Sequence, residues 1–369
     1  MALKVDCPQK DLSEALGLTS VASKLNTPHT ILQNLKIAAK NGGIRVLACD
    51  GEMWVERDLA CLVHEPGATC VQAKLFSDLV GSLPEGDVQL SVVDHQGMML
   101  HQGPSEYRVH AQDAEDFPEP PAYGGDGELT MKMGDLRRAI ESVIFAVSSD
   151  PHRQILTGVQ FTYDGETLTL VATDTHRLAV RRLKQDGIGS NVSVVAPERA
   201  LRAIRSLPLG DEDSITIRFG EGRLGVEAGG AKVVAQLLAG AYPNWERVVP
   251  SEHTRTWTVE ADQLEDRAKR ALIVARDAAN RIRFKGEGEL LVLSARSEEK
   301  GDAREELPMV AQSGDIEIAF NGAYVRDALG PIAGPGVRIE MTESSRPALF
   351  RPAEDGEEYF CVIMPMALA

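Results

Sequence analysis

The stretch VATDTHRLAV, residues 171–180, places an acid, an imidazole and a guanidinium within four positions. These are Asp174, His176 and Arg177. General acid–base catalysis needs an imidazole that is oriented by a carboxylate and lies next to a substrate proton. Because side chains alternate along a β-strand, a strand here would point Asp174 and His176 to the same side. One hypothesis is therefore an acid–base active site.

Other features of the sequence argue against catalysis. The chain has no GxSxG, HExxH or P-loop motif, and no GxGxxG that follows a strand. Its eight histidines are scattered rather than clustered. Asp50 occupies the position equivalent to Asp174 in an internal repeat, and an Asp that recurs at one position is typical of a turn residue that caps backbone amides. We therefore expect no catalytic residue.

The composition is that of a globular protein without a membrane segment. The chain has 369 residues, of which 43% are hydrophobic and 25% charged, which favours two or three domains. No window approaches 18 uninterrupted apolar residues, and the N-terminus lacks the pattern of a signal peptide, so we expect a cytoplasmic protein that does not enter membranes. The five cysteines form no CxxC pair. We expect no metal and no cofactor.

A repeat of 124 residues organises the chain. ILQNL at 31–35 matches ILTGV at 155–159, ACD at 48–50 matches ATD at 172–174, and SLPEGD at 82–87 matches SLPLGD at 206–211. Phe117-Pro118 and Tyr242-Pro243 follow at an offset of 125. A third, more divergent copy begins near Arg255, where TWTVEADQLEDRAKRAL aligns with LTMKMGDLRRAI. A constant offset over such a distance indicates tandem duplicated domains.

The repeat predicts three domains, at residues 1–122, 128–248 and 254–369. Period-two segments such as QLSVV, TLTLVA, SITIRF and VRIEM predict strands, and each domain has two amphipathic helical segments. The fold class is therefore α+β, with antiparallel sheets and two helices in each domain. Residues 119–128 and 248–256 are expected to be linkers, because Pro, Gly and polar residues dominate them.

The net charge of −16 argues against a strongly basic nucleic-acid binder, since duplex binding is mostly neutralisation of phosphates. Basic residues nevertheless recur on the polar faces of the predicted helices, as in PERALRAIRSL. Aromatic residues make up only 5% of the chain, which argues against stacking on unpaired bases. The expected interaction is sequence-independent attraction to a duplex backbone, through Lys24, Lys74, Arg138, Arg199, Arg202, Arg205 and Arg276.

The motifs HRQILTGVQF, VATDTHRLAV, AYPNWERVVP, FNGAYVRDAL and the C-terminal VIMPM, in this order, resemble the bacterial DNA polymerase III beta subunit family, the replicative sliding clamps. The resemblance covers the whole chain. It implies a head-to-tail homodimer that forms a ring of six similar domains, encircles duplex DNA and tethers polymerases without being an enzyme. A ring needs only a weakly basic lining, because enclosure prevents escape, and this reconciles DNA binding with an acidic chain.

The resemblance also implies a peptide-docking pocket between the second and third domains. Its matching residues are Leu156, Thr173, Thr175, His176, Arg177, Leu178, Pro243, Arg247, Val248, Val362 and Met364, with a neighbouring subsite at Arg153, Asn321, Tyr324, Pro347, Pro365 and Met366. Apolar and sulfur-containing side chains suit the Leu and Phe of a short linear peptide. The partners that the family implies are the DNA polymerase III alpha subunit, the clamp loader, repair polymerases, ligase and mismatch-repair proteins.

The ring-closing contact that the resemblance implies joins the first domain of one copy to the third domain of the next. The matching residues are Tyr107 and Val109 against Leu272 and Ile273. One departure from the family pattern concerns the pocket: Thr175 stands where the family usually has Gly. It leaves open an alternative, a duplicate or inhibitor-resistant paralogue of the clamp with altered partner binding.

Overall fold

The computed structural model describes residues 3–24, 27–40, 42–94, 97–312, 314–332, 334–354, 356 and 358–368. The chain forms two compact units. Unit 1 consists of Met1–Leu136, Ile188–Ser190 and Arg199–Leu237, and unit 2 of Arg137–Gly187, Asn191–Glu198 and Leu238–Ala369. Residues 128–248, the predicted second domain, contribute to both units, and the predicted domain boundaries stay a prediction.

Unit 1 is built on one antiparallel sheet of 13 strands. In spatial order these are β10 (Gly127–Lys132), β15 (Ser214–Gly220), β16 (Arg223–Ala228), β17 (Ala231–Gln236), β4 (Met53–Ala60), β3 (Gly43–Cys49), β2 (Asn34–Lys40), β6 (Gly67–Gln72), β9 (Ser105–Gln112), β8 (Gly97–Gln102), β7 (Asp87–Asp94), β1 (Lys4–Pro8) and β5 (Leu62–Glu65). The pairing of β4 with β17, in which Trp54 lies opposite Val234, joins the first repeat to the second; we call it the first junction.

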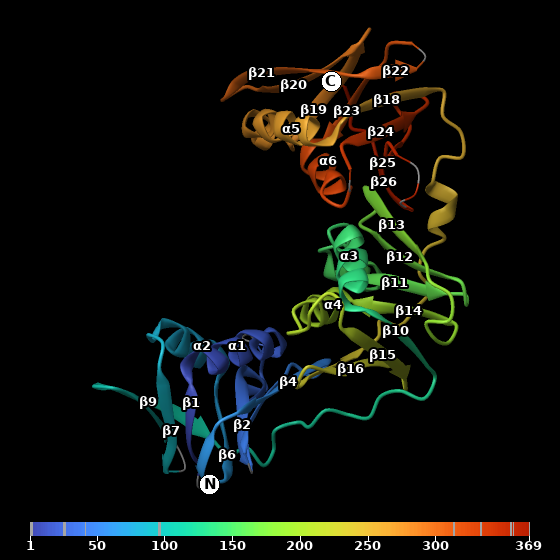
Figure 1. Ribbon diagram of the computed structural model, residues 1–369. Helices are drawn as coiled ribbons and strands as arrows, with labels where there is room; N and C mark the ends of the chain where they lie inside the picture. Colours follow the sequence, from blue (N-terminus) through green and yellow to red (C-terminus); the bar gives the residue numbers. More distant parts are fainter. Residues whose placement is uncertain are drawn as a thin grey trace. The chain divides into compact units, whose positions relative to one another are not determined.

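The helices of unit 1 bury one face each. These are α1 (Gln9–Thr19), α2 (Ala73–Ser82), α4 (Glu198–Arg205), whose first residue belongs to unit 2, and the 3₁₀ turns η1 (Ser20–Ala22) and η2 (Thr30–Gln33). Leu12 and Leu16 of α1 and Phe76 of α2 are almost fully buried, as expected for amphipathic helices that cover a sheet. Figure 1 shows α1 and α2 beside one another against the strands.

Unit 2 contains a nine-stranded and a four-stranded antiparallel sheet. The larger has the order β14 (Val192–Pro197), β11 (Gly158–Tyr163), β12 (Thr167–Thr173), β13 (Arg177–Lys184), β26 (Tyr359–Ile363), β25 (Ala348–Pro352), β24 (Gly336–Met341), β18 (Arg255–Glu260) and β22 (Val310–Gln312). The smaller has β21 (Gly301–Pro308), β20 (Leu290–Ser297), β19 (Arg281–Glu287) and β23 (Glu317–Asn321). The pairing of β13 with β26, in which Leu178 lies opposite Val362, is the second junction.

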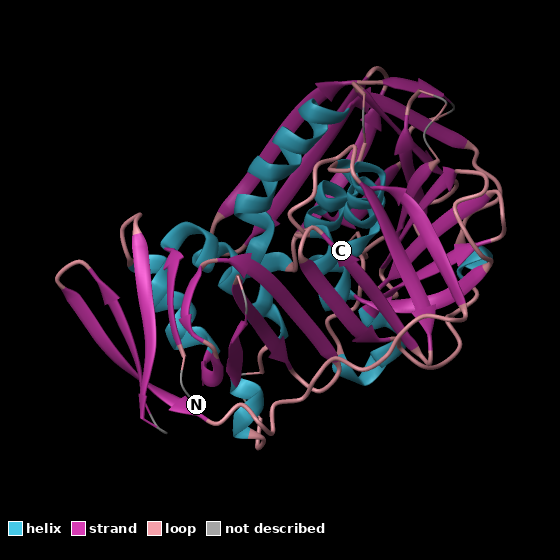
Figure 2. Ribbon diagram, turned by 60° about the horizontal axis from the view of Figure 1, so that its bottom comes forward, coloured by secondary structure: helices cyan, strands magenta, loops and turns pink. Residues whose placement is uncertain are grey.

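The helical elements of unit 2 are α3 (Met133–Ile144), whose first turn belongs to unit 1, α5 (Ala261–Ala275), α6 (Gly322–Leu329), η3 (Pro151–Thr157), η4 (Trp245–Val248) and η5 (Arg276–Ala278). Helix α5 packs against α6 and runs along β19, β20 and β21 (Figure 2). Phe284, Phe320 and Phe350 form an edge-to-face series in the core, with ring centroids 5.5 and 5.6 Å apart.

The predicted α+β class is confirmed, and every strand pairing among the described residues is antiparallel. The segments QLSVV, TLTLVA, SITIRF and VRIEM are strands as predicted, and the predicted helices are present. In the second repeat, the helix that contains the aligned segment GDLRRAI begins at Met133 and ends at Ile144. Residues 119–126 of the first expected linker lie between β9 and β10, and its last two residues belong to β10. Residues 249–254 of the second lie between η4 and β18, whereas Val248 belongs to η4 and residues 255–256 belong to β18. Within the described part of the chain, no helix is long and apolar enough to cross a membrane.

Candidate functional site

The residues Asp174, Thr175 and His176 form a tight turn between β12 and β13. One carboxylate oxygen of Asp174, Oδ1, accepts hydrogen bonds from the backbone N–H groups of His176 and Arg177, both at 2.9 Å. The prediction that a strand points the side chains of Asp174 and His176 to the same side is therefore wrong, because the turn interrupts the alternation of side chains. The expectation of an amide-capping aspartate is confirmed.

The equivalent turn in the first repeat has the same construction. Oδ1 of Asp50 accepts from the backbone N–H groups of Glu52 at 2.9 Å and Met53 at 2.8 Å. In both turns the second oxygen binds an arginine: Oδ2 of Asp50 pairs with Arg199, and Oδ2 of Asp174 accepts from Nε of Arg177 at 3.0 Å. The repeated aspartate thus serves turn geometry and an ion pair.

Thr175 adopts a left-handed backbone conformation, with φ of 77°. A β-branched residue is strained there, whereas glycine is not. The residue makes two hydrogen bonds nearby: its hydroxyl accepts from Nη1 of Arg153 at 2.7 Å, and its backbone N–H donates to Oγ1 of Thr173 at 3.1 Å. Thr175, which stands where the family pattern has Gly, therefore adds backbone strain to the turn. It also connects the turn to η3 through Arg153.

Arg177 is held in a closed network rather than presented to solvent, since its side chain is only 10% exposed. The guanidinium donates to Asp174, to Asp327 of α6 and to the carbonyl of Phe145. It lies over the rings of Phe145 and Tyr324, 5.2 and 4.3 Å from their centroids. Burial lowers the pKa of Arg177, but the hydrogen bond and charge of Asp327 and the charge of Asp174 outweigh burial and raise it above the ordinary value.

An apolar cluster covers the second junction. Its buried members are Val171, Leu178, Val180, Leu349 and Val362, and the partly buried Tyr242, Trp245, Val249 and Phe360 pack against them. We call this cluster, together with Val248 of η4 and Met364 after β26, the docking cleft, after the role that the sequence predicts for it. Val248 and Met364 are 54% and 42% exposed. A buried apolar floor with exposed apolar side chains beside it suits a hydrophobic side chain of a ligand.

The other predicted pocket residues differ in their exposure. Leu156 is buried, while His176, Pro243 and Arg247 are exposed. The backbone N–H of Met364 donates to the carbonyl of His176 at 2.9 Å, so the C-terminal segment is fixed to the β12–β13 turn.

In the predicted subsite, Asn321 caps α6 by accepting from the N–H of Ala323 at 3.0 Å, and the N–H of Met366 donates to the carbonyl of Ala319 at 2.7 Å. Pro347 and Pro365 are partly exposed. The fold of unit 2 thus brings together side chains from the turn, η3, η4, α6 and the C-terminus.

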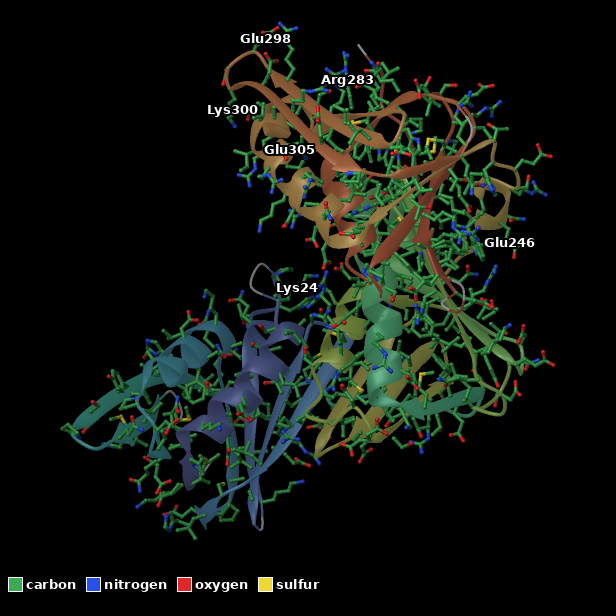
Figure 3. All side chains as sticks on the ribbon, turned by 45° about the horizontal axis from the view of Figure 1, so that its top comes forward. Lys24, Glu246, Arg283, Glu298, Lys300 and Glu305 are labelled. Carbon is green, nitrogen blue, oxygen red and sulfur yellow. The ribbon has the colours of Figure 1, made fainter. Side chains whose placement is uncertain are left out.

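The predicted DNA-facing residues differ in their surroundings. Arg199 pairs with Asp50, whose side chain is buried, and donates to the carbonyl of Val21 at 2.6 Å. Lys74 pairs with Asp78 at 2.8 Å on an exposed helix face. Lys24 is exposed on the loop after η1 (Figure 3), and Arg138 and Arg202 are exposed on α3 and α4. Arg205 is partly exposed on α4, and Arg276 is exposed at the start of η5. Arg199 therefore has a structural contact that helical periodicity did not reveal.

The predicted interface residues divide into exposed and buried pairs. Tyr107 on β9 and Ile273 on α5 are 38% and 63% exposed. Val109 and Leu272 are each 7% exposed, because they pack inside their own domains. Only the first pair offers apolar surface to a second chain.

Sequence reasoning missed Asp327, Phe145 and Trp245, which shape this site. Trp245 lies in the quoted motif AYPNWERVVP, and its ring lies 5.8 Å from the guanidinium carbon of Arg182. Asp327 is 150 positions from Arg177 in the sequence. An aspartate on a helix surface is common, so nothing in the sequence indicates that the two residues form an ion pair.

Comparisons with known proteins agree with this architecture. Sequence models of the N-terminal, central and C-terminal domains of the DNA polymerase III beta subunit match residues 3–121, 130–244 and 246–367. The beta sliding clamp of Synechocystis is 28% identical over 99% of this chain and all of its own.

Two solved structures share the fold over the full length of both chains. The DNA polymerase III beta subunit of Thermotoga maritima matches with a TM-score of 0.89 at 23% identity. A sliding clamp of Pseudomonas aeruginosa, solved bound to griselimycin, matches with a TM-score of 0.87 at 25% identity. The chain therefore belongs to the DNA polymerase III beta subunit family and is a non-catalytic sliding clamp of three tandem domains.

Proposed function

We propose that this clamp closes head to tail with a second copy into a ring around duplex DNA, and that the docking cleft holds linear peptides of replication and repair proteins. The observation that carries the proposal is the cleft itself, in which Leu178 and Val362 form a buried floor beside the exposed Val248 and Met364. Peptide Leu and Phe side chains fit such an apolar surface.

The proposed partners are the DNA polymerase III alpha subunit, the clamp loader, repair polymerases, ligase and mismatch-repair proteins. All would compete for one cleft per chain. The proposed peptide contacts are the pocket and subsite residues named from the sequence, with the guanidinium of Arg177 acting through the shape of the turn, since its side chain is largely buried.

Two strands support the proposed ring closure. β6 pairs with β9 at Ala111 and Gln112, near the C-terminal end of β9. β21 is one of the two outer strands of the four-stranded sheet. Edge strands of this kind join sheets across a heterologous interface, and the exposed Tyr107 and Ile273 would flank the joint.

The test of the ring is topological. The purified chain should be a dimer by light scattering and, after loading, should stay on circular duplex DNA but slide off linear duplex DNA. Ile273→Asp should give monomers that are retained on neither. Equal release of the unmodified chain from both DNAs would contradict the proposal.

A second candidate is a duplicate or inhibitor-resistant paralogue with altered partner binding. It is favoured by Thr175, whose strained backbone and contact with Arg153 occur at the edge of the docking cleft. Titration with a peptide of the type Gln-Leu-Ser-Leu-Phe tests it. A replicative clamp should bind this peptide at one site per chain, whereas the paralogue should bind only after Thr175→Gly.

A further inference from the structure

The two junctions are structural copies of each other. In the first, Trp54 of β4 lies opposite Val234 of β17, and in the second, Leu178 of β13 lies opposite Val362 of β26. Trp54 and Leu178 are separated by the repeat length, 178 − 54 = 124. Each junction carries an apolar cluster, and at the first it consists of Leu47, Cys49, Trp54, Cys70, Ala114, Phe117 and Val234, with Ile31, Leu32, Ala68 and Tyr123 packed against it.

One position differs in a way that changes the surface. At the second junction Leu349 of β25 lies opposite Val362, whereas at the first junction Gly225 of β16 lies opposite Val234. A Cβ atom on Gly225 would lie 2.0 Å from Cδ2 of Tyr123. The ring of Tyr123 therefore occupies the space that the side chain of Leu349 takes in the other copy.

Tyr123 belongs to the linker between β9 and β10, and this linker is held in place at several points. Nζ of Lys232 lies 5.5 Å from the centroid of the Tyr123 ring, and Nη1 of Arg223 donates to the carbonyl of Ala122 at 3.4 Å. Burial, followed by the charge of Glu227, raises the pKa of Tyr123. Phe117, earlier in the same segment, is 3% exposed. The segment thus fits into the first junction as a ligand would.

The first junction also contains an unused hydrogen-bond donor. Trp54 is 9% exposed, and its indole N–H finds no acceptor among the described residues. A buried donor without a partner costs about 1–3 kcal/mol. The backbone carbonyl of a bound peptide is the kind of acceptor that would satisfy it.

We infer that the first junction is a second docking cleft, closed by residues 114–123 of the same chain, and that it takes the same class of ligand as the second junction. The inference rests on the proposed docking function of the second junction. The ligand is a linear peptide that replaces Tyr123 with its own aromatic or leucine side chain. Because a short tether gives an effective concentration on the order of millimolar, a free peptide of micromolar affinity is outcompeted by roughly a hundredfold or more.

Two variants test whether the Tyr123 ring closes the cleft. Tyr123→Ala removes the occupying ring. Gly225→Ala instead adds a Cβ where the ring lies, which is also where a ligand side chain would lie. Tyr123→Phe is the matched control that keeps the ring. Calorimetric titration with Gln-Leu-Ser-Leu-Phe should give two sites per chain for Tyr123→Ala, and one site for the unmodified protein, Tyr123→Phe and Gly225→Ala. One site in Tyr123→Ala would overturn the inference.

The same titration separates this inference from the proposed function. No site in the unmodified chain, with one site in Tyr123→Ala, would contradict docking at the second junction and support it at the first. If Tyr123→Ala loses cooperative thermal unfolding, the unmodified chain itself provides the test. Chymotrypsin should cleave after Tyr123 at least about tenfold more slowly in the folded chain than in a synthetic peptide of residues 119–128, because a docked segment is protected until it opens. Equal cleavage rates would overturn the inference.

Discussion

Nη1 of Arg153 donates a hydrogen bond of 2.7 Å to the hydroxyl of Thr175 and so connects η3 to the β12–β13 turn. Arg153 also lies 3.5 Å from the carboxylate of Asp150, which caps the start of η3. Thr175 makes this contact from a left-handed backbone conformation that a β-branched residue adopts only at a cost. The relationship places a strained residue and a long arginine side chain together in the turn that precedes Leu178.

Replacing Thr175 separates the strain from the contact. Thr175→Gly removes both, and Thr175→Ala removes the hydroxyl but keeps a Cβ at positive φ. We expect the glycine variant to be more stable than the alanine variant by about 1 kcal/mol in urea unfolding, because glycine adopts this conformation without a steric penalty. Equal stabilities would show that the turn is unstrained.

The same pair of variants tests the role of Thr175 in ligand binding. If the hydroxyl restrains Arg153, both variants should bind the Gln-Leu-Ser-Leu-Phe peptide more tightly, by roughly threefold, or about 0.7 kcal/mol. Peptide affinity that changes only in the glycine variant would assign the effect to the backbone instead. Fluorescence anisotropy with a labelled peptide measures the difference.

Arg177 should matter for stability more than its ion-pair partner Asp327. Arg177→Lys removes the planar contacts with Phe145 and Tyr324 and shortens the reach to three acceptors, at an expected cost of about 2–4 kcal/mol. Asp327→Asn should cost about 1 kcal/mol or less, because the Asp327 side chain is 44% exposed. Chemical denaturation of both variants checks the order, and a reversed order would contradict the network.

Variants of the arginines on α4 should distinguish a structural role, expected for Arg199, from a DNA-binding role, expected for Arg202 and Arg205. Arg199→Ala leaves the buried carboxylate of Asp50 without its arginine partner and should destabilise unit 1 by about 1–3 kcal/mol. Arg202→Ala and Arg205→Ala together should instead reduce the salt dependence of DNA binding, by up to about 0.9 in slope for each phosphate that is no longer neutralised, with dimerisation unchanged. Loss of the dimer in the double variant would show that these arginines are structural.

Glu56 gives a pH dependence of defined sign. Burial, opposed in part by Arg45 and Lys232, raises the pKa of Glu56 in the folded chain. A raised carboxyl pKa contributes stability that is present below the unfolded pKa and is lost as the pH rises through the folded pKa. The stability of Glu56→Gln relative to the unmodified chain should therefore increase from about pH 4 to about pH 7, as measured by urea unfolding across that range.

Glu305 is the control, because its pKa is shifted in the opposite direction from that of Glu56. Its hydrogen bonds to Arg270, both 2.8 Å, lower the pKa of Glu305, and Figure 3 shows this residue on β21. The stability that Glu305 contributes is present above its unfolded pKa and is lost as the pH falls through the folded pKa. Glu305→Gln should therefore lose stability relative to the unmodified chain over the same rise in pH. Parallel slopes for the two variants would contradict these assignments.

The repeat, the strands and the helices could be read from the sequence because each depends on local patterns. Alternation predicted β7, β12, β15 and β24, and the matched Asp50 and Asp174 predicted two amide-capping turns. The resemblance supplied the candidate pocket around Leu178 and Val362, which the fold brings together as opposite residues of neighbouring strands. Helical periodicity did not predict the ion pair of Arg199 with Asp50, because a helical wheel shows which face of a helix is polar but not which carboxylate lies opposite that face.

The sequence by itself determined that this chain is a threefold repeat of an α+β domain, because duplicated turns and periodic burial are visible in neighbouring residues. Only the tertiary structure decided how the two copies of the junction differ. Whether a surface is open depends on which distant side chain fills it, and Gly225 and Tyr123 lie about a hundred positions apart, 225 − 123 = 102. Such a contact is set by packing between strands, and no local pattern encodes it.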